Sequence, residues 1–449
     1  MSMPRIRFRA GGSTLLVGGT LVLVSFVVYL LGARLYNAGR GDYFYLADSF
    51  LHGRTWLEAN LPPFDDVLVN GKLYIPFGPL PAVLFMPLVA LVGPDTAITW
   101  QPIVDAAIAA FDVWLVWLLV GRLGVTRLSD RTWLAVLFGF STAMWWITTR
   151  GGVWHIAELV GPALTLLALL ELQGHRRAWL IGLLAGAAFL TRTVLVVTVP
   201  FFALWYLLDL RGPAADEPRA ADTTLTTGPG EEHPTAAPTS LAASEGRSVI
   251  AAASLGTRVA ALAQRLPLDQ WADIVILFLP ALFITFWYDE VRFGSLFETG
   301  YGISYLLPWL EIERDQGMFS VVHLSMNLDL LFTHLPAFST TFPFLQPDGY
   351  GMSVFLTSPA LLVALRADRH DRRVWILASG FVATLVPSLL YYGGGWIQYG
   401  YRYILDAIPF LMALTALAVA RHGLGIGWKV LIVFGVLINA IGVYWAYRL

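Results

Sequence analysis

Asp42 follows an apolar run, residues 14–36, that is long enough to cross a bilayer, and it lies in the polar, aromatic segment 37–54. A carboxylate at the end of a membrane span can take a proton from a hydroxyl group, or it can cap a helix that begins at Tyr43. Asp48 comes six residues later, on a different face from Asp42 of an ideal helix that turns about 100° per residue. We therefore expect only Asp42 of this pair to be catalytic.

Arg192 is the most unusual cation in the sequence, because it lies between the two apolar halves of residues 179–208. A guanidinium group at such a depth costs at least ~2.5 kcal/mol unless it is paired or hydrated. It therefore needs an anionic ligand or a carboxylate of the protein. Asp105 and Asp112 are candidate protein partners, since their spacing puts them on one face of a helix.

Two further groups of polar residues lie at the ends of apolar runs. His155 and Glu158 share one helix face, where they form either a hydrogen-bonded pair or part of a metal site. Arg402 lies among aromatic residues in "YGYRYILDAIP". An arginine in this setting either anchors the helix at the lipid headgroups or binds a phosphate group.

The composition identifies a membrane protein that crosses the bilayer several times. Of the 449 residues, 57% are hydrophobic and only 13% are charged, whereas about a quarter of an ordinary soluble sequence is charged. The net charge of −2 gives no sign of a nucleic-acid partner. The chain has no cysteine, which excludes disulfides, thiolate metal ligands and a cysteine nucleophile. It also lacks a phosphate-binding Walker loop, a GxGxxG motif that opens a helix, and a G-x-S-x-G motif.

Run length and the arginine-rich loops predict an all-α bundle of about eleven transmembrane helices with a cytoplasmic N-terminus. The expected spans cover residues 14–36, 101–121, 132–148, 156–172, two legs of a shallow hairpin within 179–208, then 272–288, 354–365, 374–391, 404–420 and 428–446. The run 78–93 is short and contains three prolines, so we expect it to lie along the outer membrane surface. Residues 37–100 then form one large external loop that carries interfacial helices.

These predicted spans divide the chain into three parts. Residues 1–208 form an N-terminal catalytic module with six spans and the first external loop. Residues 209–270, rich in Ala, Thr, Pro, Glu and Gly, form a partly disordered cytoplasmic linker. Residues 271–449 form a C-terminal transmembrane module with the remaining spans.

Most polar residues of unusual placement fall in or beside the external loops, so an active site would face outward. The predicted site consists of Asp42 as the catalytic residue and a substrate-binding set of Lys72, Arg150, His155, Glu158, Arg192, Arg292, Tyr399 and Arg402.

Several stretches, in this order, resemble the GT-C superfamily of membrane glycosyltransferases. They include the first span with its Asp-containing loop, "NGKLYIPFGPLPAVLFMPL" and "LAGAAFLTRTVLVVTVP". "YDEVRFGSLFETGYG", "TSPALLVAL" and "YGYRYILDAIPFL" resemble the branch of protein O-mannosyltransferases and aminoarabinose transferases. Many relatives carry an Asp-Glu pair in the first loop, whereas this chain has "GDY".

The resemblance implies inverting transfer of a hexose or pentose from a polyprenyl-phosphate carrier to a glycan, lipid or protein acceptor. The reaction would take place on the outer face of the plasma or inner membrane. Asp42 matches the position of the family's aspartate, which deprotonates the acceptor. No cofactor is implied, and a divalent metal is left open.

The sequence leaves three alternative functions open. A membrane transporter or a flippase for lipid-linked glycans would place polar residues along a path through both halves of the bilayer. A binding or scaffolding protein without transferase activity would keep the fold but not the turnover. A ligase or polymerase that acts on lipid-diphosphate glycans is an enzymatic alternative.

The arginine distribution predicts that Ser129 lies on the cytoplasmic side. Because the chain has no native cysteine, a Ser129→Cys variant carries a single thiol. We expect a membrane-impermeant maleimide to label it only after the cells are opened. Labelling in intact cells would reverse the predicted orientation.

Overall fold

The computed structural model describes residues 12–34, 40–58, 65–208, 268–446 and 448. Most of the predicted linker 209–270 lies outside the described residues, so its predicted disorder stays a prediction.

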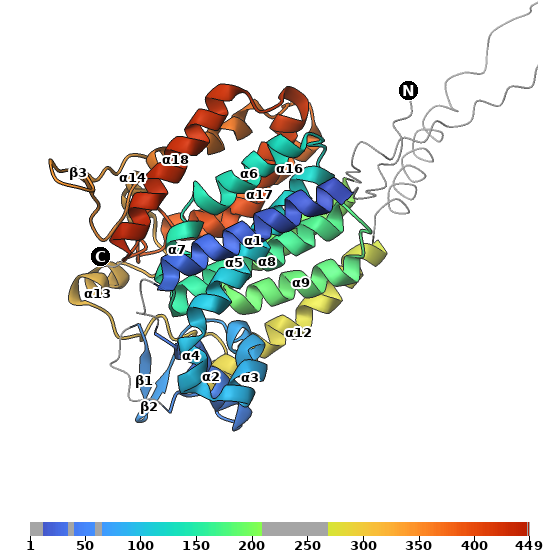
Figure 1. Cartoon of the computed structure of the whole chain (residues 1–449). Helices are drawn as coiled ribbons and strands as arrows, with labels where there is room; N and C mark the ends of the chain where they lie inside the picture. Colours follow the sequence, from blue (N-terminus) through green and yellow to red (C-terminus); the bar gives the residue numbers. More distant parts are fainter. Residues whose placement is uncertain (1–11, 35–39, 59–64, 209–267, 447, 449) are drawn as a thin grey trace, which may run out of the picture.

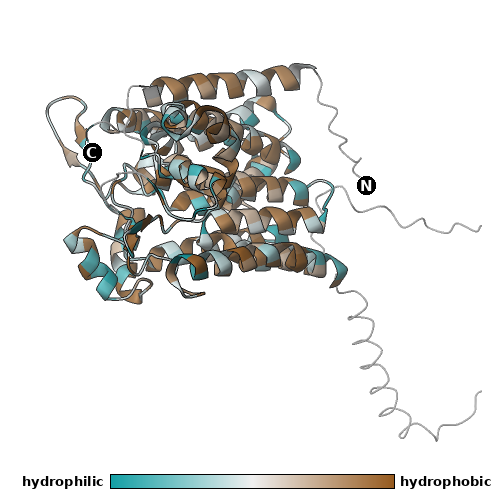
Figure 2. Cartoon of the chain, turned by 90° about the horizontal axis from the view of Figure 1, so that it is seen from below, coloured by the Kyte–Doolittle hydropathy of each residue, from teal (hydrophilic) through white to brown (hydrophobic). Residues whose placement is uncertain are grey.

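The described chain forms an α-helical bundle, which confirms an all-α polytopic membrane protein (Figure 1). Seven of its helices are long and apolar enough to cross a bilayer: α1 (Gly12–Arg34), α5 (Gln101–Arg122), α8 (Val153–Leu172), α12 (Leu268–Phe293), α16 (Arg372–Leu390), α17 (Ile404–His422) and α18 (Ile426–Trp445). At about 1.5 Å per residue, each approaches or exceeds the roughly 30 Å hydrocarbon thickness. Apolar residues run along the helices, as the brown colouring in Figure 2 shows.

The other four predicted spans are helical but interrupted or short. They form α6 (Leu128–Phe140) with α7 (Met144–Arg150), then α9 (Ala178–Thr191), the 3₁₀ helix η1 (Thr193–Val197) with α10 (Thr198–Leu207), and α15 (Val354–Thr357) with the 3₁₀ helix η3 (Pro359–Arg366). Arg192 separates α9 from η1 in an extended conformation, at the apex of the predicted hairpin. Ser358 precedes a proline, which disfavours α-helical geometry at Ser358. By length and composition, the described chain therefore has seven clear spans rather than the eleven expected.

The helices α5, α8 and α17 form the interior of the bundle. Helix α5 packs against α1, α6 and α8, while α17 packs against α8, α16 and η3. Helices α8 and α17 are the most buried of the seven long helices. Their N-terminal ends carry Glu158 and Asp406, which brings charged groups into the protein interior rather than toward lipid.

The described part of the predicted external loop 37–100, which we call the first external region, packs as a small layer at one end of the bundle (Figure 1). It contains α2 (Asp42–Leu51), the hairpin of β1 (Val67–Val69) and β2 (Lys72–Tyr74), α3 (Leu80–Val92) and α4 (Pro94–Thr99). The hairpin turns at Asn70 and Gly71, both at positive φ, as an Asn-Gly turn requires. Helix α3 spans only about 20 Å and packs on α2. This supports an interfacial position for the 78–93 run.

Residues 294–353, which the arginine distribution also predicts to be external and which we call the second external region, lie at the same end. This region contains α13 (Pro308–Asp315), the 3₁₀ helix η2 (Val321–His323), α14 (Leu324–Phe332) and the short hairpin of β3 (Ala337–Phe338) and β4 (Leu345–Gln346). The two regions are joined through Tyr305, whose backbone exchanges hydrogen bonds of 2.9 and 2.7 Å with Asp65 and Asp66.

Glycines allow α9 and α12 to approach closely. Gly182 and Gly186, one helical turn apart, face α12. A Cβ atom on Gly182 would collide with the backbone of Ile274, and one on Gly186 would lie 3.1 Å from Ala281 Cβ. Small residues at this spacing stabilise membrane helix pairs because they permit tight van der Waals packing.

We therefore expect Gly182→Ala to destabilise the protein by about 1–3 kcal/mol, as in other overpacked sites. The control is Gly19→Ala in α1, where nothing lies within 4 Å of an added Cβ. Thermal unfolding in detergent should show a lower Tm for Gly182→Ala alone. Equal melting of both variants would contradict the tight α9–α12 contact.

Candidate functional site

A cavity of about 250 Å³ opens between the two external regions and the adjoining ends of the bundle helices. Its charged lining residues are Asp65, Glu158, Arg192 and Arg402. Its aromatic lining residues are Phe77, Trp154, Phe297, Tyr301, Phe319, Tyr391, Tyr392, Trp396 and Tyr403. Three of the nine predicted site residues, Glu158, Arg192 and Arg402, therefore meet in one cavity.

Two arginines and two carboxylates form a buried network at this cavity. Arg192 Nε lies 2.7 and 2.9 Å from the two carboxylate oxygens of Asp406. Arg192 Nη1 and Arg402 Nη1 lie 3.6 and 3.1 Å from the same oxygen, Glu158 Oε1. Because both carboxylates are fully buried, each charge depends on its partners. The network joins α8, the α9–η1 junction and the start of α17.

The pairing of Arg192 with Asp105 or Asp112 is wrong. Asp105 and Asp112 are buried within α5, where Gln101 Nε2 donates a 3.4 Å hydrogen bond to Asp105. Arg192 instead reaches Asp406, 214 positions away in the sequence. Helical spacing relates residues of one helix, but the partner across a bundle depends on how the helices pack.

Asp65 brings a carboxylate to the cavity wall from the first external region. Its Oδ2 accepts a 2.9 Å hydrogen bond from Trp154 Nε1, at the start of α8. Its backbone has φ of 59°, a left-handed conformation that Asp adopts more readily than most residues. Two glycines at positive φ, Gly151 and Gly152, turn the chain from α7 into α8 and so present Trp154 to Asp65.

Asp42 begins α2 and is 1% exposed. Its Oδ2 lies 3.3 Å from Arg40 Nε, and Arg40 Nη2 lies 2.5 Å from Asp66 Oδ2. Asp42 does not line the cavity but stands close to Asp65, whose charge acts on it. Asp48 is partly exposed and pairs with His52 and Arg54 at 3.6 Å, so the two carboxylates of α2 do have different surroundings.

The carboxyl groups of Asp42 and Asp65 hold their protons more tightly than aspartate side chains in water do. Burial raises the pKa of Asp42 to about 7, against the lowering effect of Arg40. Burial also raises the pKa of Asp65 to about 6, although the hydrogen bond from Trp154 lowers it. A carboxylate with a pKa near neutrality is suited to accept a proton at physiological pH.

His155 lies next to the cavity-lining Trp154 but does not itself line the cavity. The ring is buried, with Nδ1 2.5 Å from the carbonyl oxygen of Gly151, and it makes an edge-to-face contact with Trp146 at 5.3 Å between centroids. It therefore supports the start of α8.

Tyr399 contacts α18 and Arg150 contacts Ala446, which follows its last residue; neither lines the cavity. Arg150 Nη1 donates to the carbonyl of Ala446 at 2.8 Å, and the Tyr399 hydroxyl donates to the carbonyl of Ile438 at 2.8 Å. Both bonds hold α18 in place.

Lys72 and Arg292 contact the first external region rather than the cavity. Lys72 Nζ lies 3.6 Å from the ring centroid of Trp56 and is exposed. Arg292 binds Asp289 at 2.6 Å and donates to the carbonyl of Ile75 at 2.7 Å. Arg292 thereby fixes this region to α12. Substrate contacts of all five residues stay predictions.

The sequence reasoning missed Asp65, Asp66 and Asp406. An acidic doublet in an external loop was a usable signal, because it places two adjacent carboxylates beside a predicted outward-facing site. Asp406 follows Arg402 by one helical turn within the quoted "YGYRYILDAIP".

Among the described residues, no three His, Asp or Glu side chains are grouped as metal ligands.

No protein-family model and no curated protein matches this chain. Among solved structures, it is similar to the crystal structure of the apo oligosaccharyltransferase of Archaeoglobus fulgidus, with 13% sequence identity and a TM-score of 0.40. The match covers 96% of this chain and 55% of that one, so the chain spans about half the length of the transferase. A likeness this remote does not assign the chain to a family.

The raised pKa of Asp42 predicts a pH-dependent stability. Because the folded protein binds this proton up to about pH 7 and the unfolded chain only to about pH 4, stability falls as pH rises through that window. Asp42→Asn removes the titration. We expect its Tm in detergent, relative to the wild type, to be higher at pH 8 than at pH 4.

The matched control is Asp48→Asn, at a partly exposed position of the same helix. Its difference from the wild type should change little with pH. A Tm difference for Asp42→Asn that stays constant from pH 4 to 8 would show that burial does not raise this pKa.

Proposed function

We propose that this protein is an inverting glycosyltransferase that moves a hexose or pentose from a polyprenyl-phosphate carrier to an acceptor hydroxyl. The observation that carries this proposal is one cavity that combines the carboxylate of Asp65 with the guanidinium groups of Arg192 and Arg402. The resemblance of the sequence motifs to GT-C glycosyltransferases supports the same reaction class.

The reaction needs a base for the acceptor. In our proposal, Asp65 takes the proton of the acceptor hydroxyl as its oxygen forms a bond to the anomeric carbon of the sugar. The bond from that carbon to the phosphate oxygen breaks on the opposite face, so the configuration inverts. The pKa of Asp65, about 6, leaves it ionised at neutral pH.

Asp42 is the base that the sequence resemblance favours, and it lies in the same cluster of acidic residues as Asp65 and Asp66. Its pKa of about 7 also suits proton transfer. Since Asp65 lines the cavity and Asp42 does not, we assign the first proton transfer to Asp65. Asp42 then helps to set the charge around Asp65 through their mutual repulsion.

The departing phosphate requires cations that are already in place. Arg192 and Arg402 are held by Glu158 and Asp406 before any ligand binds, so they need little reorganisation. Each guanidinium has five N–H donors, and Nε of Arg402 has no hydrogen-bond partner among the described residues. Donors therefore remain for phosphate oxygens, even though the network is neutral overall.

The aromatic lining suits a sugar ring and an isoprenoid chain. Tyr391, Tyr392 and Trp396 offer flat faces for the apolar faces of a sugar. Helix α3, in the first external region, exposes Val83, Leu84 and Leu91, which fits contact with lipid. We propose that the carrier tail stays in the bilayer of the cell membrane and that the cavity faces outward.

A transporter or flippase is less well supported. The cavity lies toward one end of the bundle, beside the two external regions, rather than along a path through both halves. A binding protein without activity would bind a donor but give no turnover in the experiment that follows.

The test measures polyprenyl phosphate released by purified protein from a panel of short-chain polyprenyl-phosphate monosaccharides, with membrane extract as the acceptor source. We expect turnover with at least one donor. Asp65→Asn should lower turnover by about 10²- to 10⁴-fold, the usual worth of a general base.

Asp42→Asn and Asp48→Asn are measured beside it. Asp48→Asn should be nearly normal, because Asp48 does not line the cavity and pairs instead with His52 and Arg54. A deeper loss in Asp42→Asn than in Asp65→Asn would transfer the base role to Asp42. Donor binding without turnover by the wild type, across the whole panel, would refute a transferase.

A further inference from the structure

An aromatic hairpin projects from the second external region. We define it as residues 335–346, which include β3 and β4. Phe338, Phe342 and Phe344 are 76%, 67% and 56% exposed, and Leu335 is also exposed. Four large apolar side chains within ten residues are unusual on a surface that faces water, and such a patch marks an interaction site.

The hairpin lies against the end of α18. The ring of Phe342 packs on Tyr444 at 5.3 Å between centroids, and Trp445 Nε1 donates to the carbonyl of Leu345 at 2.8 Å. Figure 1 shows β3 beside this end of α18.

The contact with α18 sets the depth of the hairpin in the membrane. Helix α18 has 20 residues, close to the length of one crossing. Its exposed residues Val430, Val433 and Leu437 form a lipid-facing stripe. Tyr and Trp collect at the level of the lipid headgroups, so Tyr444 and Trp445 mark the membrane surface. Phe342 therefore extends a lipid-facing surface.

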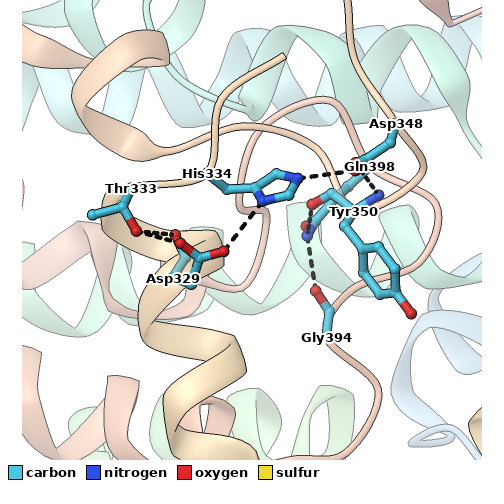
Figure 3. Close-up of polar contacts among 7 residues, drawn as sticks. All are labelled: Asp329, Thr333, His334, Asp348, Tyr350, Gly394 and Gln398. Atoms are coloured by element: carbon cyan, nitrogen blue, oxygen red, sulfur yellow. Dashed lines mark hydrogen bonds and ion pairs between the residues drawn. The ribbon is translucent and has the colours of Figure 1, made fainter. Parts of the chain in front are cut away.

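The base of the hairpin is fastened on both sides, as Figure 3 shows. His334, just before it, lies 2.9 Å from Asp348, just after it, and 3.2 Å from Asp329 of α14. Tyr350 N donates to Asp348, and the carbonyl of Tyr350 accepts from Gln398. These bonds fix the base of the hairpin relative to the bundle.

We propose that the aromatic hairpin inserts its phenylalanines into the near leaflet, at the boundary between headgroups and acyl chains. The occupant of this surface is lipid, because the patch continues the lipid-facing surface of α18. The hairpin is also connected to the cavity through hydrogen bonds. Gln398 Oε1 accepts from the backbone N–H of Arg402, so the fastened base connects to a cavity-lining arginine.

The absence of cysteine makes a direct test possible. Thr340→Cys places one thiol at the exposed tip, where an environment-sensitive fluorophore is attached. The full-length protein is reconstituted in phosphatidylcholine vesicles that contain spin-labelled lipid, with the label either near the headgroup or deep in the chain. Leu437→Cys on α18 serves as the lipid-exposed reference, and Asp315→Cys at the end of α13 as the water-exposed reference.

We expect the Thr340 probe to be quenched several-fold more than the Asp315 probe, and more by the shallow label than by the deep one. Changing Phe338, Phe342 and Phe344 together to serine should reduce quenching to the Asp315 level. The Leu437 probe in the same triple variant should remain quenched, which shows that the bundle is still inserted.

Quenching of the Thr340 probe no greater than that of Asp315 would overturn the proposal and leave the patch for a soluble partner. Unchanged quenching in the triple variant would also overturn it, because the phenylalanines would then not be the anchor. Neither result depends on glycosyl transfer, so the proposed function stands or falls separately.

Discussion

The buried network of Arg192, Asp406, Glu158 and Arg402 is the constraint on which this structure depends. Four charges lie in the interior of a membrane protein, where an unpaired charge is far more costly than in water. Loss of one partner from such a group typically costs about 3–5 kcal/mol, because the remaining charge is stranded. The helices α8, α9 and α17 must therefore pack so that the four charged side chains lie at the same level of the bundle. The same requirement holds two cations beside the cavity.

The first external region completes the site because it is fixed to the bundle at several points. Gly78 lies directly on the backbone of Leu190 at the end of α9, where a side chain would not fit. Arg292 ties the same region to α12. Asp65 is thus carried to the cavity by a layer that cannot shift freely. A polar loop over a membrane bundle becomes a precise part of a site only when such contacts restrain it.

The sequence by itself determined the class of the protein and the order of its elements. Apolar runs of about 20 residues have to become helices, since no other single segment satisfies its own backbone hydrogen bonds in lipid. The sequence also predicted that the short, proline-containing run 78–93 does not cross the membrane and that the apolar segment 179–208 is divided at Arg192. The sequence did not determine which apolar segments are continuous, because interruptions such as Ser358 depend on local bonding and on neighbouring helices.

Only the tertiary structure decided which polar residues meet. Glu158, Arg192 and Arg402 were predicted from the sequence, because charged residues at the ends of apolar segments need partners. Their partner Asp406 and the cavity-lining Asp65 were not, since Asp406 pairs with Arg192, 214 positions away, and Asp65 comes from a loop distant in sequence from all three. Tyr399 and Arg292 were also predicted as site residues; both donate to backbone carbonyls outside the cavity, and their substrate contacts stay predictions. One-dimensional spacing specifies a helix face, whereas the partner of that face depends on packing across the whole bundle.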